Sequence, residues 1–159
     1  MKKIIINILI VIILVIFQVG LIPALPYPLN NFPLVLGWLI FLAVILDFKS
    51  ALGQVLGIGF LLEIFSVYPY GLLMASLFLI IVLIRWLFNQ FFTNRSYYSL
   101  LFLGFIGIIF YQLLILSGSW LFYALNFSVV NNGFNLQYLY GLLWQVVLNL
   151  VWLTIIWLI

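Results

Sequence analysis

The chain has 159 residues, of which 69% are hydrophobic and only 4% are charged, and its formal net charge is +3. So few charges cannot hydrate the surface of a globular protein of 18.4 kDa, so the composition excludes a water-soluble protein and indicates one embedded in lipid. The chain contains no Cys and no His, which excludes disulfides, thiolate chemistry, imidazole bases and the usual zinc sites. We therefore expect no metal and no cofactor. The five cations are too scattered to form a nucleic-acid-binding patch.

The apolar stretches predict helices. A membrane-spanning helix needs roughly 20 mainly apolar residues, and nearly the whole chain divides into such stretches. Runs such as residues 4–17 and 77–83 do not alternate apolar and polar residues, as barrel strands would. We therefore predict an all-α, polytopic membrane helical bundle that forms a single integral membrane domain over residues 1–159. About six transmembrane helices are expected, at about residues 4–22, 34–46, 51–67, 72–92, 98–116 and 138–159.

The first third of the chain allows more than one arrangement of spans. Lys2 and Lys3 followed by an apolar run resemble a signal peptide, but the run is longer than a secretory core of roughly 7–15 residues, and no small-residue cleavage site follows. We interpret it as a retained span. Residues 23–33 contain four of the five prolines, which prevent a continuous helix. The span predicted at 34–46 is short, so it is either tilted, partly re-entrant or extended into the proline-rich segment. A count of five spans, with 34–46 and 51–67 forming a hairpin that does not cross, is the main alternative.

Polar turns separate the later spans. Residues 47–50 precede the third span, and residues 68–71, Tyr-Pro-Tyr-Gly, interrupt the chain before the fourth. Residues 93–96 form the next turn. The fifth span could extend as far as residue 125, and a polar stretch at 126–137 precedes the sixth.

The basic residues predict the orientation. With six spans, Lys2, Lys3, Lys49 and Arg95 fall on the same side of the membrane, and the connections on the other side carry no charge. Arg85 lies about seven residues, or ~10 Å of helix, from the same face, and a long side chain can reach part of that depth. Short cytoplasmic loops carry an excess of Lys and Arg, so we predict that both termini are cytoplasmic.

Glu63 is an acidic residue well inside a predicted span, with no cation beside it in the sequence. A charge at the centre of a membrane helix costs about 2.5–3.5 kcal/mol, which makes such a residue worth explaining. Gly59 and Ser66 share its helical face, where Gly59 would let another backbone approach and Ser66 could hydrogen-bond near the carboxylate. Glu63 is therefore either a hydrogen-bonding node, structural or partner-facing, or an interfacial acid that simply reaches water.

Small and amide side chains suggest how the helices pack. Gly53 and Gly57 form a G-x-x-x-G pattern, and Gly104 and Gly107 repeat it less regularly, so we predict close helix packing, internal rather than between copies. Interhelical hydrogen bonds, worth about 0.6 kcal/mol each, are expected from the buried amides. These amides are Gln18, Gln54, Gln112, Gln145 and Asn149.

Catalytic chemistry is not expected. Asp47 and Glu63, the two acids, fall in opposite halves of the membrane in the predicted topology, so they cannot form a catalytic pair. No activated nucleophile or metal cluster can be assembled around either of them. We therefore predict that the protein is not an enzyme.

Residues 57–71, with the sequence GIGFLLEIFSVYPYG, resemble the central signature of the MreD family of small bacterial inner-membrane proteins. In that family a Gly-containing helix leads to an acid, a Ser three residues later, and a Pro-x-Gly break. The corresponding positions here are Glu63, Ser66, Pro69 and Gly71. This chain has Glu where the family usually has Asp, and the pattern covers about a tenth of the sequence.

The resemblance implies a function in cell shape. It implies a scaffold of the rod-shape, or elongasome, machinery that directs peptidoglycan synthesis, in the bacterial inner membrane. The expected partners are an MreC-like single-span protein and the cell-wall synthase complex. MreD-like folds are also similar to the substrate-binding components of energy-coupling-factor transporters. The alternative is therefore a vitamin-binding membrane subunit, with an outward pocket of aromatic and amide side chains from residues 126–137 and the loop between the first two spans. A lipid-handling function has no specific support in the sequence.

Overall fold

The computed structural model describes residues 2–45, 48–92, 96–125 and 136–158. Every regular element in these ranges is helical, as predicted. The six α-helices are α1 (Lys2–Ile16), α2 (Leu34–Ile45), α3 (Phe48–Ile64), α4 (Leu72–Phe91), α5 (Tyr97–Ala124) and α6 (Leu136–Leu158). A π-helical turn (Phe17–Leu21) continues α1, and two 3-10 turns (Ile22–Ala24 and Leu29–Asn31) precede α2.

The predicted boundaries agree with the helices, with two differences. The third helix begins and ends earlier than the predicted 51–67, and α5 extends to Ala124, well beyond 116. The start of α5 is set by a capping box, in which the Ser96 hydroxyl accepts from the Ser99 N–H at 3.3 Å and the Ser99 hydroxyl accepts from the Ser96 N–H at 3.2 Å. Most of the polar stretch at 126–137 lies outside the described residues.

Four helical segments are long and apolar enough to cross a membrane, judged by length and composition. They are Ile6–Ala24, Leu72–Phe91, Tyr97–Ala124 and Tyr138–Leu158. The remaining two helices are shorter, with 12 residues in α2 and 17 in α3. At 1.5 Å per residue, α2 covers ~18 Å, which is well short of a hydrocarbon core about 30 Å thick. The helical membrane bundle is therefore carried by four full-length helices.

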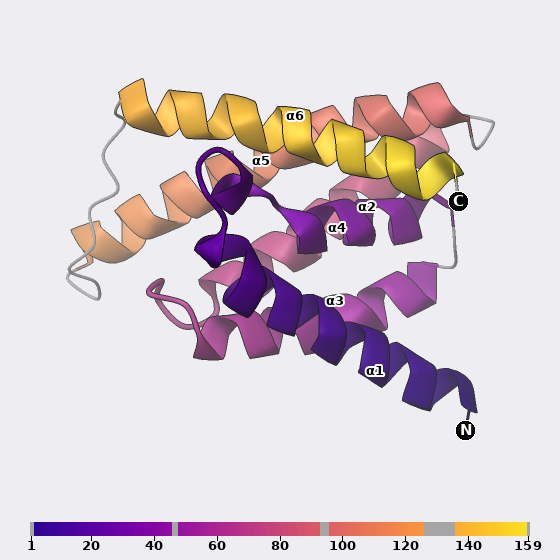
Figure 1. Ribbon diagram of the computed structural model, residues 1–159, viewed down its shortest axis with the longest axis horizontal. Helices are drawn as coiled ribbons and strands as arrows, with labels where there is room; N and C mark the ends of the chain where they lie inside the picture. The colour runs from indigo at the N-terminus through magenta and orange to yellow at the C-terminus, as the bar shows by residue number, and fades with distance from the viewer. Residues whose placement is uncertain (1, 46–47, 93–95, 126–135, 159) are drawn as a thin grey trace.

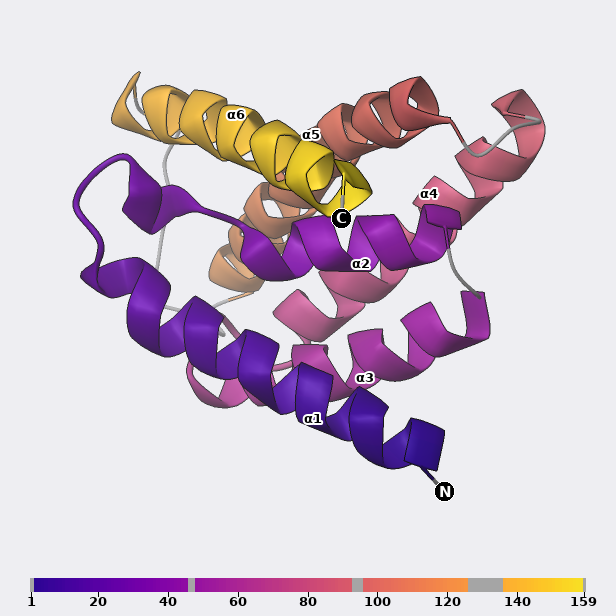
Figure 2. The same ribbon diagram turned by 45° about the vertical axis from the view of Figure 1, so that its right-hand side comes forward.

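The short helix α2 lies at the centre of the bundle. It contacts each of the other five helices, and Figure 2 shows it between α5 and α6 on one side and α1 and α3 on the other. Nine of its 12 residues are buried, and Leu39, Ile40 and Ala43 are completely inaccessible. Because α2 itself is covered by protein, its backbone is kept away from lipid, where unpaired polar groups are prohibitive.

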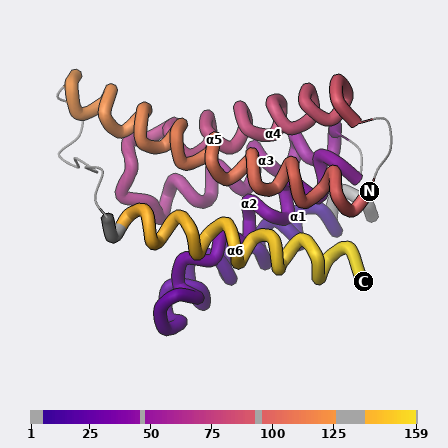
Figure 3. Tube along the Cα trace, turned by 90° about the horizontal axis from the view of Figure 1, so that it is seen from above, coloured from indigo at the N-terminus to yellow at the C-terminus, as the bar shows by residue number. Residues whose placement is uncertain are grey.

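Amide side chains satisfy the backbone where α2 begins. The proline-rich segment leaves carbonyl and N–H groups without helical partners, and Figure 3 shows this segment looping out beside α6. Gln18 donates through Nε2 to the carbonyl of Phe32 at 3.2 Å, and its Oε1 accepts from the N–H of Val35 at 3.2 Å. Asn149 of α6 donates through Nδ2 to the carbonyl of Pro33 at 3.4 Å. The predicted interhelical role is confirmed for Gln18, which binds α2 at Val35, whereas Asn149 of α6 binds Pro33 in the segment before α2.

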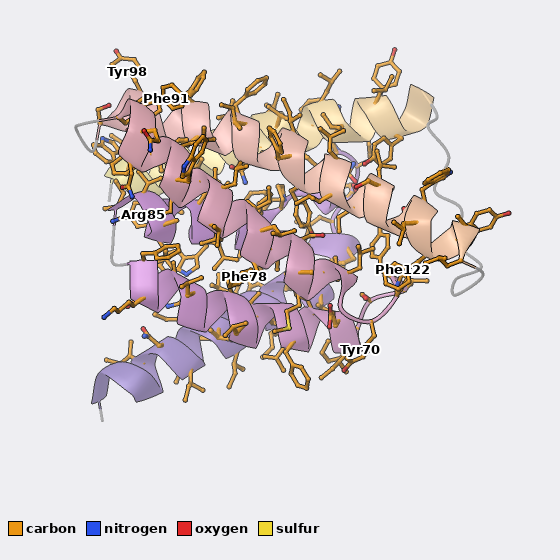
Figure 4. All side chains as sticks on the ribbon, turned by 180° about the vertical axis from the view of Figure 1, so that it is seen from behind. Tyr70, Phe78, Arg85, Phe91, Tyr98 and Phe122 are labelled. Carbon is orange, nitrogen blue, oxygen red and sulfur yellow. The ribbon has the colours of Figure 1, made fainter. Side chains whose placement is uncertain are left out.

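The helices run alternately between two ends of the molecule. In Figure 1 the first turn of α1, the end of α2, the start of α3 and the last turn of α6 all lie at one end. Figure 4 places Arg85 and Tyr98 toward that end and Tyr70 toward the opposite one. Arg85 donates to the carbonyl of Ala43 at 3.1 Å, in the last turn of α2, where a cation also complements the helix dipole.

Glycines allow close packing at some of the predicted positions. A Cβ placed on Gly107 would lie 2.9 Å from Cδ1 of Ile40 in α2, and one on Gly104 would overlap Cδ1 of Leu153 in α6. The same test on Gly57 gives an ordinary contact of 3.5 Å to Val11 in α1. Internal packing is therefore tight at the two α5 glycines and ordinary at Gly57.

Gly53 shows no such close contact with the described residues. A Cβ on Gly53 would meet nothing within 4 Å among the described residues. A Cβ on Gly59 would instead lie 3.0 Å from the Cα of Met74. The third helix therefore approaches α4 through Gly59, closer to its C-terminal end, and the G-x-x-x-G pattern does not act as a unit.

Alanine substitutions at these two positions provide a matched test on one helix. We expect Gly59→Ala to lower the free energy of unfolding by about 1–3 kcal/mol, because the contact is with backbone that cannot rotate away. Gly53→Ala should be neutral or raise it by up to about 1 kcal/mol, because Ala is the better helix former. Thermal unfolding in detergent measures both. If Gly59→Ala is as neutral as Gly53→Ala, the close contact of Gly59 with α4 does not contribute to stability.

Candidate functional site

The turn between α3 and α4 contains most of the predicted site residues. The last turn of α3 closes with a hydrogen bond of 3.2 Å from the N–H of Ser66 to the carbonyl of Glu63. The carbonyl of Pro69 then accepts from the N–H of Leu72 at 3.2 Å, and Gly71 has φ 92° and ψ −19°. These are the features of a type II turn, whose third residue requires a positive φ and so favours glycine. The Pro-x-Gly pattern is therefore explained by the reversal of the chain before α4.

Glu63 caps the next helix. Its Oε1 accepts from the N–H of Met74 at 2.9 Å, in the first turn of α4. N–H groups in the first turn have no acceptor within their own helix, and Gly71, the N-cap residue, has no side chain to supply one. The carboxylate from α3 takes this role, and the positive end of the α4 dipole favours a negative group there.

Gly59 makes this cap possible. Gly59 lies one helical turn before Glu63, and both residues meet Met74. A side chain on Gly59 would push the first turn of α4 away from α3, and with it the N–H that Glu63 binds. The two residues predicted to share a face therefore work together, with Gly59 supplying the close approach and Glu63 the acceptor.

Glu63 is only 5% exposed and its carboxylate binds the Met74 N–H, which is the geometry of a structural hydrogen-bonding node. The expected hydrogen bond from Ser66 toward the carboxylate is wrong. Because α3 ends at Ile64, Ser66 lies in the turn and off the helical face, and its buried hydroxyl has no partner among the described residues.

A polar cavity lies in the same half of the molecule as this turn. Two adjoining cavities, of about 290 and 430 Å³, share the side chains of Asn30, Asn31, Gln112 and Gln145. They lie between the segment before α2 and the helices α5 and α6. Leu62 and Tyr68, which flank the α3–α4 turn, line the first cavity, and Tyr138 lines the second.

Hydrogen bonds connect the cavity walls. Gln112 of α5 donates through Nε2 to Oε1 of Gln145 in α6, and the Tyr138 hydroxyl donates to Oε1 of Gln112 at 2.7 Å. These bonds confirm the predicted interhelical role of Gln112 and Gln145. The same holds for Gln54, whose Oε1 accepts from Trp38 Nε1 at 2.9 Å, in a separate contact between α2 and α3.

Asn30 and Asn31 were not singled out from the sequence as cavity residues, although a polar pair placed directly before a short apolar helix is a usable signal. The loop between the first two spans was expected to line an outward pocket, and Asn30 and Asn31 do line the cavity. The other expected contributor, 126–137, lies for the most part outside the described residues.

Comparisons of the chain with protein-family models, with curated proteins and with solved structures give no match. The resemblance to the MreD family therefore depends on residues 57–71 alone.

Replacement of Glu63 tests its role as a cap. Glu63→Leu removes the acceptor and leaves the Met74 N–H buried without a partner, so we expect a loss of about 1–3 kcal/mol in the free energy of unfolding. Glu63→Gln keeps an amide oxygen at the same reach and should lose less than half of that amount. Thermal unfolding in detergent measures both variants. If Glu63→Leu unfolds at the temperature of the unmodified protein, the cap does not contribute to stability.

Proposed function

We propose that this protein is a non-enzymatic scaffold of the bacterial cell-wall elongation machinery, located in the inner membrane with both termini cytoplasmic. The observation that carries the proposal is the α3–α4 turn, because the residues that resemble the MreD signature are the ones that build it. Glu63, Gly59, Pro69 and Gly71 each have a role in holding this turn in one conformation. A rigid reversal at the membrane surface is well suited to presenting a fixed contact to a partner.

The partner in this proposal is an MreC-like single-span protein, and through it the cell-wall synthase complex. Large apolar side chains are exposed around the turn, namely Ile64, Phe65, Val67 and Tyr70. Aromatic residues of this kind dominate the binding energy of many interfaces. Since Glu63 is buried behind them, it acts by positioning the turn, and the exposed side chains make the contact.

The topology in this proposal has six passes. The alternating direction of the helices supports it, because the start of α1 and the end of α6 lie at the same end of the molecule (Figure 1). In this arrangement α2 crosses only the half of the membrane near Arg85, and the proline-rich segment, most of which is exposed, completes the pass beside α6 (Figure 3). The cation Lys49, exposed at the start of α3, then lies on the cytoplasmic side.

A second candidate function is favoured by the cavity. A substrate-binding membrane subunit of a vitamin transporter needs a pocket lined by aromatic and amide groups, and Gln112, Gln145, Tyr111 and Tyr138 are groups of this kind. Co-purification with a pair of ATPases would favour this function. Co-purification with an MreC-like protein would favour the scaffold.

Single cysteines test the six-pass topology, because the natural chain has none. We expect a membrane-impermeant maleimide to label Tyr70→Cys in intact spheroplasts, since Tyr70 is 68% exposed at the outer end. Lys49→Cys and Tyr98→Cys should react only after permeabilisation. Labelling of Lys49→Cys in intact spheroplasts would support the five-span alternative, in which α2 and α3 form a hairpin that does not cross.

Two exposed tyrosines provide a matched test of the partner surface. We expect Tyr70→Ala to reduce capture of a co-expressed MreC-like protein about tenfold or more, because a central aromatic contact is commonly worth 2 kcal/mol or more. Tyr98→Ala, at the opposite end and 80% exposed, should leave capture unchanged. The readout is the amount of partner retained on affinity-tagged protein in detergent. Equal capture by both variants and the unmodified protein would exclude this surface.

A further inference from the structure

We propose that the polar cavity between the segment before α2 and the helices α5 and α6 binds an uncharged ligand group that carries hydroxyl or amide functions. The proposal goes beyond the scaffold function and does not depend on it. It gives the class of substrate for the transport alternative. The charge, the hydrogen-bonding capacity and the size of the cavity each indicate this class of ligand.

The cavity contains no charged side chain among the residues that line it. A charged ligand buried here would lose its hydration without gaining a counter-charge, which is strongly unfavourable. The cavity therefore selects against phosphates, carboxylates and ammonium groups.

Several amides on the cavity wall have unused hydrogen-bonding capacity. An amide side chain offers two donors and an acceptor with two lone pairs. Asn30 and Asn31 make no side-chain hydrogen bond to the described residues, and neither does Nε2 of Gln145. These groups come from two separate parts of the chain and converge on one space. They can bind a ligand whose donors and acceptors alternate over a short distance, as they do in sugars and in ring carboxamides.

The same cavity has an apolar side. Leu62 of α3, Leu73 and Leu77 of α4, and Ile115 of α5 line the first cavity together with the amides. The volumes of about 290 and 430 Å³ are close to the lower end of the range of small-molecule sites, which is about 300–1,000 Å³. The fit is to a ligand with one apolar face and one polar edge, about the size of a single ring system or one sugar.

Such a group has two possible sources, a free small molecule or the headgroup of a neutral glycolipid. Two measurements on protein in phosphatidylglycerol nanodiscs distinguish these two sources, because this lipid is anionic and carries no sugar. One arm titrates nicotinamide, with its carboxylate counterpart nicotinate as the charged control, and follows Trp fluorescence. The other arm adds monoglucosyl diacylglycerol and measures the bound lipid by native mass spectrometry.

We expect binding of one uncharged probe, with nicotinate and phosphatidylglycerol at least tenfold weaker. Gln145→Leu should weaken that binding about tenfold, and Gln54→Leu should leave it unchanged, because Gln54 is an amide of the same type that does not line the cavity. Asn30→Ala, at a side chain with no hydrogen bond to lose among the described residues, should weaken binding without changing the unfolding temperature.

Each possible result supports or overturns the proposal. Nicotinamide binding would identify a free small molecule as the source, and glycolipid binding would identify a headgroup. The proposal fails if neither uncharged probe binds, if the charged probes bind as well, or if Gln54→Leu and Gln145→Leu have the same effect. The capture experiment with Tyr70→Ala is independent of all these results, so failure here leaves the scaffold proposal intact.

Discussion

The constraint that governs this structure is the need to pair backbone polar groups in a protein that has almost no water around it. Helices satisfy this need except at their ends, where N–H and carbonyl groups lack partners. Several of the described polar side chains bind backbone groups at these ends. Glu63 accepts from the first turn of α4, and Arg85 donates to the last turn of α2. Gln18 and Asn149 bind backbone groups beside the first turn of α2.

The short central helix follows from the same constraint. A helix of 12 residues with an unwound segment before it would be unfavourable in contact with lipid. Five surrounding helices cover it, and two amides from distant parts of the sequence bind the exposed backbone at its start. The unwound segment also places Asn30, which is exposed, and Asn31, which is half-buried, in the lining of the polar cavity. Part of the cavity lining thus depends on how α2 begins.

The two functional features lie in the same half of the molecule. Leu62 and Tyr68 border the cavity and flank the α3–α4 turn, so the space and the proposed partner surface are neighbours. A scaffold uses the outside of this region, and a binding protein uses its inside. In both uses the carboxylate of Glu63 is engaged in capping α4.

The sequence by itself determined the helical class, the approximate helix boundaries and the importance of Glu63 and the buried amides, because apolar run length and sparse charge are local properties. Only the tertiary structure decided what each polar group binds. The acceptor of the Asn149 amide is Pro33, 116 residues away, and no periodicity encodes such a pair. The same reason explains why Gly59 and not Gly53 packs against α4, and why Asn30 and Asn31 line a cavity. Spacing along a helix predicts which residues share a face, whereas the neighbour of that face depends on how six helices fill space together.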